Sequence, residues 1–236
     1  TEVKKLEKKV DRLEEELFLQ KKMNEINKLQ REAKEDDDES SPFLSRKARF
    51  RMYTEMIEKE SQLPKGERID FVSIVTPNHM HFPVARDFLL AGFNVICDKP
   101  MTLDTDEARQ LKKIVKKSKK VFALTHNYTG YPMVKLAKDM IAKGDIGKVR
   151  KIVVQYPQGW LATNLEETDQ KQAAWRTDPK KSGAAGCIGD IGTHAFQMVE
   201  YLTGQEVKSI LADLNNLYED NTLDIDGTIL VRFSDT

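Results

Sequence analysis

Cysteine, net charge and long apolar runs are all scarce in this chain, and each absence excludes a class of protein. The 236 residues hold two cysteines, Cys97 and Cys187, without CxxC spacing, so neither a disulfide framework nor a thiolate zinc site is implied and a reducing, cytoplasmic setting is expected. The 38 Lys and Arg balance the 38 Asp and Glu, so no overall field attracts nucleic acid or an anionic membrane. No apolar run approaches the roughly 20 residues that span a bilayer, and the charged N-terminal stretch has no signal-peptide core. We therefore expect a soluble protein with no nucleic-acid and no membrane partner.

Glycine and proline are missing from the first 41 residues, which differ in this from the rest of the chain. This stretch carries 23 charged side chains. Five of its apolar residues alternate at spacings of three and four, as in a coiled-coil seam: Val3, Leu6, Val10, Leu13 and Leu17. Because the seam lasts only about two and a half heptads, a single solvated helix is an open alternative. Residues 1–41 are predicted to be a separate charged helix, with an acidic linker over 34–41.

From residue 69 onward, short apolar runs alternate with amphipathic stretches, which is the pattern of βαβ units and a parallel sheet. Strands are predicted over 69–76, 93–97 and 121–127, and helices over 84–91, 104–118 and 133–143, with Gly92 and Gly144 at helix ends. Beyond residue 147, strands are predicted over 149–155, 209–215 and 228–233, and a helix over 193–202. The fold class is therefore α/β: an incomplete Rossmann-like parallel sheet over 42–147, then a partial open-sheet α/β domain over 148–236.

Polar residues follow each of the first three predicted strands. These strands end in the triplets Thr76-Pro77-Asn78, Asp98-Lys99-Pro100 and His126-Asn127-Tyr128. Ligands bind at the carboxyl ends of the strands in an open parallel sheet, so the triplets are expected at one ligand-binding edge. Lys99 is the most informative, since an ammonium on a short turn between a buried strand and a proline can donate to a substrate hydroxyl. Simple polar turns, and a surface position for Lys99, remain open alternatives.

Four glycines at three-residue spacing lead into the helix predicted over 193–202, in the segment GAAGCIGDIGTH from Gly183 to His194. Such glycines permit close approach of another backbone. If the helix has begun by Asp190, then Asp190 and His194 share one face, where a carboxylate can orient an imidazole as a general base. A helix-capping aspartate and a buried, satisfied histidine explain the same spacing equally well.

Neither a metal site nor a nucleic-acid site is expected. His79 and His81 are near neighbours, but no nearby Cys, Asp or Glu completes a ligand set. The lysines between 112 and 120 alternate with Leu111, Ile114 and Val115, which form one apolar helical face. We therefore interpret these lysines as a solvated helix surface.

Three motifs resemble those of the Gfo/Idh/MocA oxidoreductases, the family of glucose-fructose oxidoreductase and inositol dehydrogenase: DFVSIVTPN at 70–78, FNVICDKP at 93–100 and GDIGTH at 189–194. They occur in the family's order, and Trp175-Arg176 precedes the last one, as in several sugar-oxidising members. The resemblance can be traced from near Tyr53 to Thr236. It implies a Rossmann domain that binds NAD or NADP, joined to an α/β domain that covers a sugar or polyol substrate.

The resemblance also implies roles for individual residues. Lys99 hydrogen-bonds the reacting hydroxyl, His194 is the acid/base, and Asp190 fixes the substrate or His194; these three are the expected catalytic residues. The substrate is expected to contact the same three residues and Tyr128. The residues expected at the cofactor are Thr76, Pro77, Asn78, His81, Asp98, Lys99, Trp175 and Arg176. Asp98 stands where many members have Glu, a longer carboxylate.

One family feature is absent: the chain has no GxGxxG loop, and no G-x-G occurs at any position. In the family, the backbone N–H groups of this loop and the helix that follows hold the cofactor pyrophosphate. We therefore expect an incomplete chain, lacking the glycine segment and truncated at the C-terminus, that binds NAD or NADP weakly. The alternative is a catalytically inactive remnant, in which the N-terminal helix mediates association with a partner. Any homo-oligomer is expected to form through the C-terminal sheet or that helix.

Overall fold

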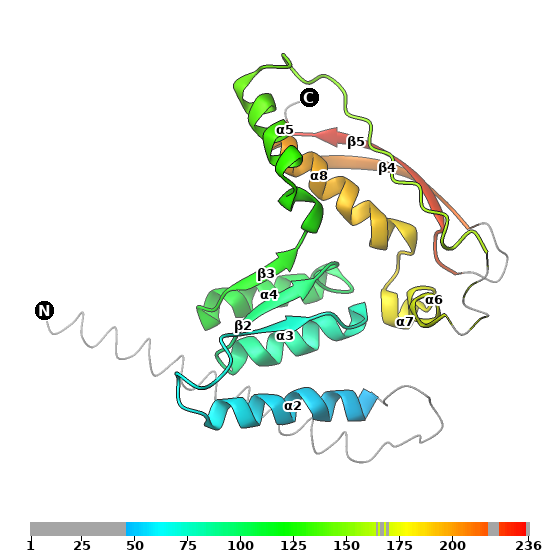
Figure 1. Ribbon diagram of the computed structural model, residues 1–236. Helices are drawn as coiled ribbons and strands as arrows, with labels where there is room; N and C mark the ends of the chain where they lie inside the picture. Colours follow the sequence, from blue (N-terminus) through cyan, green and yellow to red (C-terminus); the bar gives the residue numbers. More distant parts are fainter. Residues whose placement is uncertain (1–45, 164, 166–167, 169, 217–221, 235–236) are drawn as a thin grey trace, which may run out of the picture. The chain divides into compact units, whose positions relative to one another are not determined.

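The computed structural model describes residues 46–163, 165, 168, 170–216 and 222–234 (Figure 1). The charged helix predicted over 1–41 lies outside the described residues. The chain forms two compact units. The described residues up to Ile74, together with Phe82–Cys97 and Asp106–Ala123, make the first unit. The second unit consists of Val75–His81, Asp98–Thr105 and the described residues from Leu124 onward.

The first unit is built on a sheet of β1 (Phe71–Ile74), β2 (Asn94–Asp98) and β3 (Phe122–Thr125), in the order β1-β2-β3. β1 and β2 run parallel, with Phe71 opposite Asn94 and Ile74 opposite Cys97. The Val95 N–H donates to the Val121 carbonyl at 2.9 Å, just before β3 begins. The predicted Rossmann-like parallel sheet is confirmed, although the first and third strands are shorter than predicted.

Helices α3 (His81–Leu90) and α4 (Thr105–Ser118) follow β1 and β2, close to the predicted ranges. Gly92, just after α3, has a φ of +89°, a left-handed conformation that favours glycine. The Phe88 and Phe93 rings meet edge to face, with their centroids 5.9 Å apart. The almost completely buried apolar side chains of this unit form its core: Ala85, Phe88, Leu89, Leu90, Phe93, Val95, Cys97 and Leu111.

Helix α2 (Arg46–Gln62) also belongs to the first unit and was not predicted. It is anchored by the Tyr53 hydroxyl, which donates to Asp87 Oδ2 on α3 at 3.1 Å. Asp87 is fully buried, so this bond offsets part of the cost of burying its carboxylate. Met52 and Met56 face solvent on the same helix that buries Tyr53. Because apolar residues lie on both faces of α2, its amphipathic periodicity is blurred.

The second unit contains helices α5 (Pro132–Lys143) and α8 (Thr193–Thr203), and an antiparallel pair of strands, β4 (Val207–Asn215) and β5 (Asp226–Phe233). All four were predicted, with small differences in their ends. α5 packs against α8 (Figure 1), and Lys138 Nζ lies 4.0 Å from the centroid of the Tyr201 ring across this contact. Gly144 ends α5 in the left-handed conformation, as predicted.

Shorter elements of the second unit lie between these helices and strands. They are η1 (Asn78–Met80), η2 (Asn127–Gly130), α6 (Lys171–Arg176), α7 (Pro179–Ser182) and the π-helical turn η4 (Ile188–Gly192). The turns η1 and η2 begin shortly after β1 and β3, and η4 leads directly into α8. These short elements therefore carry five of the residues that the sequence singled out: Asn78, Tyr128, Trp175, Arg176 and Asp190.

The prediction of a strand over 149–155 was wrong. In the described part of the chain, residues 147–159 pair with no strand. Its side chains include the β-branched Ile152, Val153 and Val154, which are exposed. Strand propensity describes how well such residues fit a pleated surface beside a neighbouring strand, and it supplies no partner. β4 and β5 pair with each other. The segment 149–155 therefore has the composition of a strand but no neighbouring strand to pair with in the described part of the chain.

Candidate active site

The turn that carries Lys99 is held on both sides by side-chain hydrogen bonds. Asp98 ends β2, and its Oδ1 accepts from the Thr125 hydroxyl at 2.6 Å and from the Lys99 N–H at 3.2 Å. The peptide bond between Lys99 and Pro100 is cis. Asp98, which was expected at the cofactor, thus fastens the Lys99 turn to the end of β3.

His81 joins the turns that follow β1 and β2. Its Nδ1 lies 2.6 Å from the Pro100 carbonyl oxygen and its Nε2 lies 2.9 Å from that of Thr76. The side chain is only 1% exposed. The sequence placed His81 at the cofactor, whereas in the structure both ring nitrogens are engaged by the protein's own backbone.

The other residues of the first triplet differ in how far they are available to a ligand. Thr76 is exposed and Pro77 is half-buried. Asn78 is buried, and its Nδ2 donates to the Ser182 carbonyl at 2.8 Å. The amide of Asn78 therefore connects η1 to α7, while Thr76 and Pro77 leave surface for a ligand.

Asp190 lies between two cations. Lys99 Nζ donates to the Asp190 backbone carbonyl at 2.6 Å and also to Oδ1 of its carboxylate. Arg176 Nε donates to Oδ2 at 3.2 Å. Burial on its own would raise the pKa of Asp190, but the hydrogen bond and charge of Lys99, together with Arg176, hold it below its ordinary value. Asp190 is therefore a carboxylate that fixes the ammonium of Lys99 in place.

Arg176 is itself held by aromatic rings. Its guanidinium carbon lies 4.3 Å from the centroid of Trp175 and 5.7 Å from that of Trp160, within the range of cation–π attraction. A hydrogen bond from Arg176 Nη1 to the side chain of Gln172 completes its surroundings. Trp160 is a member of this site that the sequence did not indicate, since it lies in a segment without any motif.

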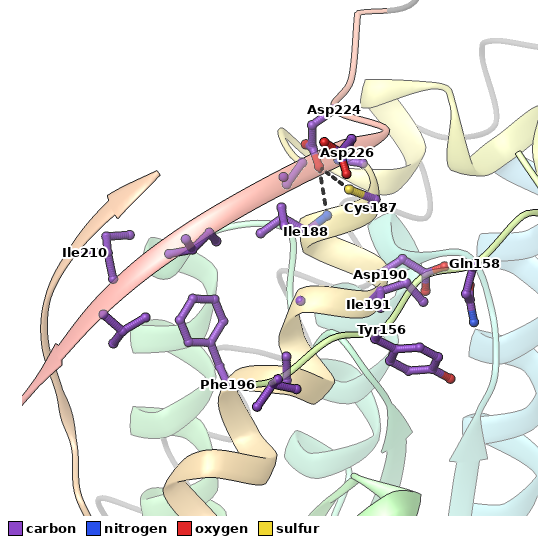
Figure 2. A pocket seen from close by; sticks show the side chains of 18 of the residues that line it. Tyr156, Gln158, Cys187, Ile188, Asp190, Ile191, Phe196, Ile210, Asp224 and Asp226 are labelled. Carbon is purple, nitrogen blue, oxygen red and sulfur yellow. Dashed lines mark hydrogen bonds between the residues drawn. The ribbon is translucent and has the colours of Figure 1, made fainter. Parts of the chain in front are cut away.

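Two of the spaced glycines before His194 allow close contacts, Gly186 with the loop before β5 and Gly192 with Ile188 in its own turn. A Cβ added to Gly186 would lie 2.1 Å from the backbone oxygen of Asp224, and one added to Gly192 would lie 3.0 Å from Ile188 Cγ2. The Asp224 carboxylate accepts from the Gly186 N–H at 2.7 Å. It also accepts from the Ile188 N–H at 2.8 Å and from Cys187 Sγ at 3.1 Å, the two bonds drawn in Figure 2. Asp224 was missed because nothing in its local sequence marks it, and its partners lie far back in the chain.

His194 lies in the first turn of α8 and is 9% exposed. Its ring centroid is 4.6 Å from that of Tyr128 and 6.3 Å from that of His126, and both contacts are edge to face. Burial, followed by the charges of Lys99 and His126, lowers the pKa of His194, while the charges of Asp190 and Asp98 oppose this. The imidazole is thus biased toward its neutral form, which can accept a proton.

The four-residue spacing of Asp190 and His194 suggested that the carboxylate orients the imidazole. In the described residues, the Asp190 carboxylate is bonded to Lys99 and Arg176, and no hydrogen bond joins it to His194. Asp190 lies within the π-helical turn η4, whose wider turn alters the alignment of side chains four residues apart. Lys99, Asp190 and His194 are nevertheless neighbours within the second unit, where their charges influence one another.

A cavity of about 1080 Å³ opens in the second unit next to this cluster. Its lining includes Asn78, Trp175 and Arg176. Tyr156 and Asp190, which Figure 2 labels, also line it. Lys99 and His194 are not part of the lining, so Asp190 and Arg176 connect the cavity to the cluster. The cavity is large enough for a small cyclic molecule next to the cluster of Lys99, Asp190 and His194.

Among the described residues, no three His, Cys, Asp or Glu side chains are grouped so that they could hold a metal ion. None of the described helices combines the length and the apolar composition that crossing a membrane requires.

Comparison with known families matches almost the whole chain. Residues 20–126 match an oxidoreductase family with an NAD-binding Rossmann fold, and residues 134–236 match the GFO/IDH/MocA C-terminal domain. YfiI, an uncharacterised oxidoreductase of Bacillus subtilis, is 32% identical over 68% of this chain and 41% of its own length. Levoglucosan dehydrogenase of Pseudarthrobacter phenanthrenivorans is 34% identical over 58% of this chain and 34% of its own length.

Solved structures agree with these matches. An inositol dehydrogenase homolog from Azotobacter vinelandii, complexed with NAD+, is similar with a TM-score of 0.74 and 29% identity, over 78% of this chain and 47% of that one. The chain thus spans less than half the length of these relatives. Because the two family matches follow one another in order along the chain and the parallel sheet is present, the chain belongs to the GFO/IDH/MocA family of oxidoreductases.

Proposed function

We propose that this chain carries the catalytic part of an NAD- or NADP-dependent oxidoreductase that oxidises a hydroxyl of a sugar or polyol. The observation that carries the proposal is the cluster in which Asp190 holds the Lys99 ammonium beside His194, whose pKa is lowered. An ammonium that donates to a hydroxyl, next to a neutral imidazole, suits the removal of the hydroxyl proton.

Each of the three residues has a distinct part in the proposed reaction. Lys99 donates to the hydroxyl oxygen and stabilises the negative charge that develops there. His194 accepts the hydroxyl proton as the C–O single bond becomes a carbonyl. Asp190 keeps Lys99 in place through its carboxylate and its backbone carbonyl. When bound, the nicotinamide ring of NAD or NADP supplies the acceptor for the hydride that leaves the carbon.

The residues next to the cluster fit the nicotinamide end of such a cofactor. Thr76 offers an exposed hydroxyl, Pro77 an apolar surface, and Trp175 a planar ring backed by the Arg176 guanidinium. His81 would act indirectly, since it holds the turns of Thr76 and Pro100 rather than facing a ligand. For the pyrophosphate, the sequence offers no G-x-G turn, so weak cofactor binding is expected of the chain as given.

The substrate class is supported by the cavity and by the relatives. A cavity of about 1080 Å³, lined by tryptophan, tyrosine and charged side chains, suits a polyhydroxylated ring, because aromatic faces pack on its C–H surfaces and polar groups bond its hydroxyls. The similarity to a levoglucosan dehydrogenase and to an inositol dehydrogenase homolog points to the same class. We therefore propose a cyclic sugar or polyol, with Tyr128 at the border of its site.

The test is a spectrophotometric assay of NADH or NADPH formation with a panel of cyclic sugars and polyols, at millimolar cofactor. Lys99→Met and His194→Asn should each lower the rate by about 100-fold or more. Lys112→Met, on the exposed face of α4, is the matched control and should leave it unchanged. No turnover by the folded chain with any of these compounds would contradict the proposal and favour the inactive remnant. Full activity of Lys99→Met would contradict the residue assignment.

A further inference from the structure

The His194 imidazole contacts aromatic rings and, among the described residues, makes no hydrogen bond to a carboxylate. In the described residues, no hydrogen bond is made by its imidazole, and Asp190 is committed to Lys99 and Arg176. The ring of Tyr128 meets the ring of His194 edge to face at 4.6 Å and 67°, and His126 meets it at 6.3 Å and 85°. Whatever fixes the Tyr128 ring therefore also fixes the imidazole.

Tyr128 is in turn held by a residue from a distant segment. Its hydroxyl shares a hydrogen bond with the hydroxyl of Tyr156, and the two rings are 5.8 Å apart. The Tyr131 ring also meets the Tyr128 ring edge to face, with the centroids 5.9 Å apart. Residues 148–158 all belong to the described part of the chain. The bond of the Tyr156 hydroxyl is the one hydrogen bond that this segment makes there. The attachment of this segment and the position of Tyr128 thus depend on the same bond.

We propose that Tyr156 is a positioning residue, whose hydroxyl holds Tyr128 against His194 and thereby sets the orientation of the imidazole for proton transfer. This inference rests on the proposed role of His194. Tyr156 is 36% exposed and lines the cavity beside Asp190, so a substrate in that cavity would also lie near the bond that it makes (Figure 2).

The protonation states around His194 allow this role. The hydrogen bond with Tyr156 raises the pKa of Tyr128 to about 12, so the Tyr128 phenol stays neutral and holds His194 by packing alone. The charged and titratable groups that face His194 from its neighbouring elements are Lys99, Asp98, His126, Tyr128 and Asp190. From α5, which also packs on α8, Lys138 faces Tyr201 instead.

The experiment compares Tyr156→Phe with the wild-type chain by NMR titration of the histidine rings. The sequence has four histidines, so the His194 signal can be assigned from a His194→Asn sample. Losing the Tyr156 hydroxyl should loosen the packing of Tyr128, admit water to His194, and raise the pKa of His194 toward its ordinary value. Tyr201→Phe, the same change on α8 itself, is the control and should leave the His194 signal unmoved. A His194 signal and titration that are unchanged in Tyr156→Phe would overturn the proposal.

Kinetics separate positioning from direct substrate contact. A misoriented base should lower kcat by about 10-fold, with KM for the substrate nearly unchanged. A raised KM at constant kcat would show that Tyr156 contacts the substrate, and would overturn the positioning role. Should Tyr156→Phe fold poorly, Tyr128→Phe removes the same hydrogen bond from the other side and must move the His194 signal in the same way. If the wild-type chain has no activity, the proposed function fails, while the NMR comparison still decides the role of Tyr156.

Discussion

Replacing Asp224 by asparagine tests how the start of α8 is fixed. In the native chain, one carboxylate oxygen accepts from the Gly186 N–H, and the other accepts from the Ile188 N–H and the Cys187 thiol. An asparagine side chain offers one oxygen and one NH2 group, so one of the two backbone donors must face another donor. The remaining bond also loses its charge assistance.

The expected loss of stability follows from these bonds. Leaving a partly buried N–H without an acceptor costs about 1–3 kcal/mol. For a chain of this size, that corresponds to a fall in Tm of about 2–4 °C for each kcal/mol. The Cys187 thiol should respond as well, because burial, then the hydrogen bond and the charge of Asp224, raises its pKa to about 12. Without that charge the pKa falls, and more thiolate is present at alkaline pH.

Two measurements check this prediction: thermal unfolding, and the rate at which Cys187 is alkylated at pH 8.5. The other thiol, Cys97, is fully buried and should stay unreactive in the folded chain. Asp213→Asn, at an exposed position on β4, serves as the control. If Asp224→Asn melted at the same temperature as Asp213→Asn and its Cys187 were no more reactive, then the carboxylate would not hold the helix start, and the reasoning would be refuted.

Three further predictions concern the same unit. Gly186→Ala should lower the free energy of unfolding by about 1–3 kcal/mol in urea titrations, because its Cβ would meet the Asp224 backbone oxygen, whereas Gly66→Ala, which has open space, should change little. Because the pKa of His194 is lowered, the acid limb of the kcat/KM profile for oxidation should lie below pH 6.5, and a limb above that value would contradict the proposed base. Because the pKa of Asp190 in the folded chain lies below 3.8, its contribution to stability is complete above that pH and is lost as the pH falls through the folded value. The difference in unfolding free energy between wild type and Asp190→Asn should therefore shrink on acidification, and a constant difference would exclude the ion pair as its source.

Periodicity and capping were sufficient to predict most of the regular structure. The apolar runs of the strands and the amphipathic pattern of the helices are clear in the sequence, and glycines with positive φ follow helices α3, α5 and α8. Helix α2 was not predicted, because apolar residues occur on both of its faces and obscure the helical pattern. The strand expected over 149–155 failed for the opposite reason, since its composition is right but the described residues give it no partner.

The site was predictable where short motifs end elements that converge. Lys99, Asp190 and His194 stand at a strand end and a helix start, and the second unit brings them together. Trp160, Tyr156 and Asp224 were missed because each is a single residue in a segment without a pattern, and each acts on a partner far away in the sequence. The contacts of His81 could not be predicted from the sequence either, because its partners are backbone carbonyl groups, which every residue has.

The cluster of Lys99, Asp190 and Arg176 has a surplus of charge that bears on which molecules it favours. Two cations share one carboxylate, so one positive charge remains without an internal counterpart among the three. In the proposed reaction, an uncharged alcohol meets this surplus only as its oxygen becomes negative, so the attraction grows along the reaction and lowers the barrier. A substrate that is already anionic would feel the same attraction on arrival, which strengthens binding without adding to the rate. Under the proposed function, the charge count of this cluster would therefore favour neutral polyols over acidic sugars in turnover, whatever their relative affinities.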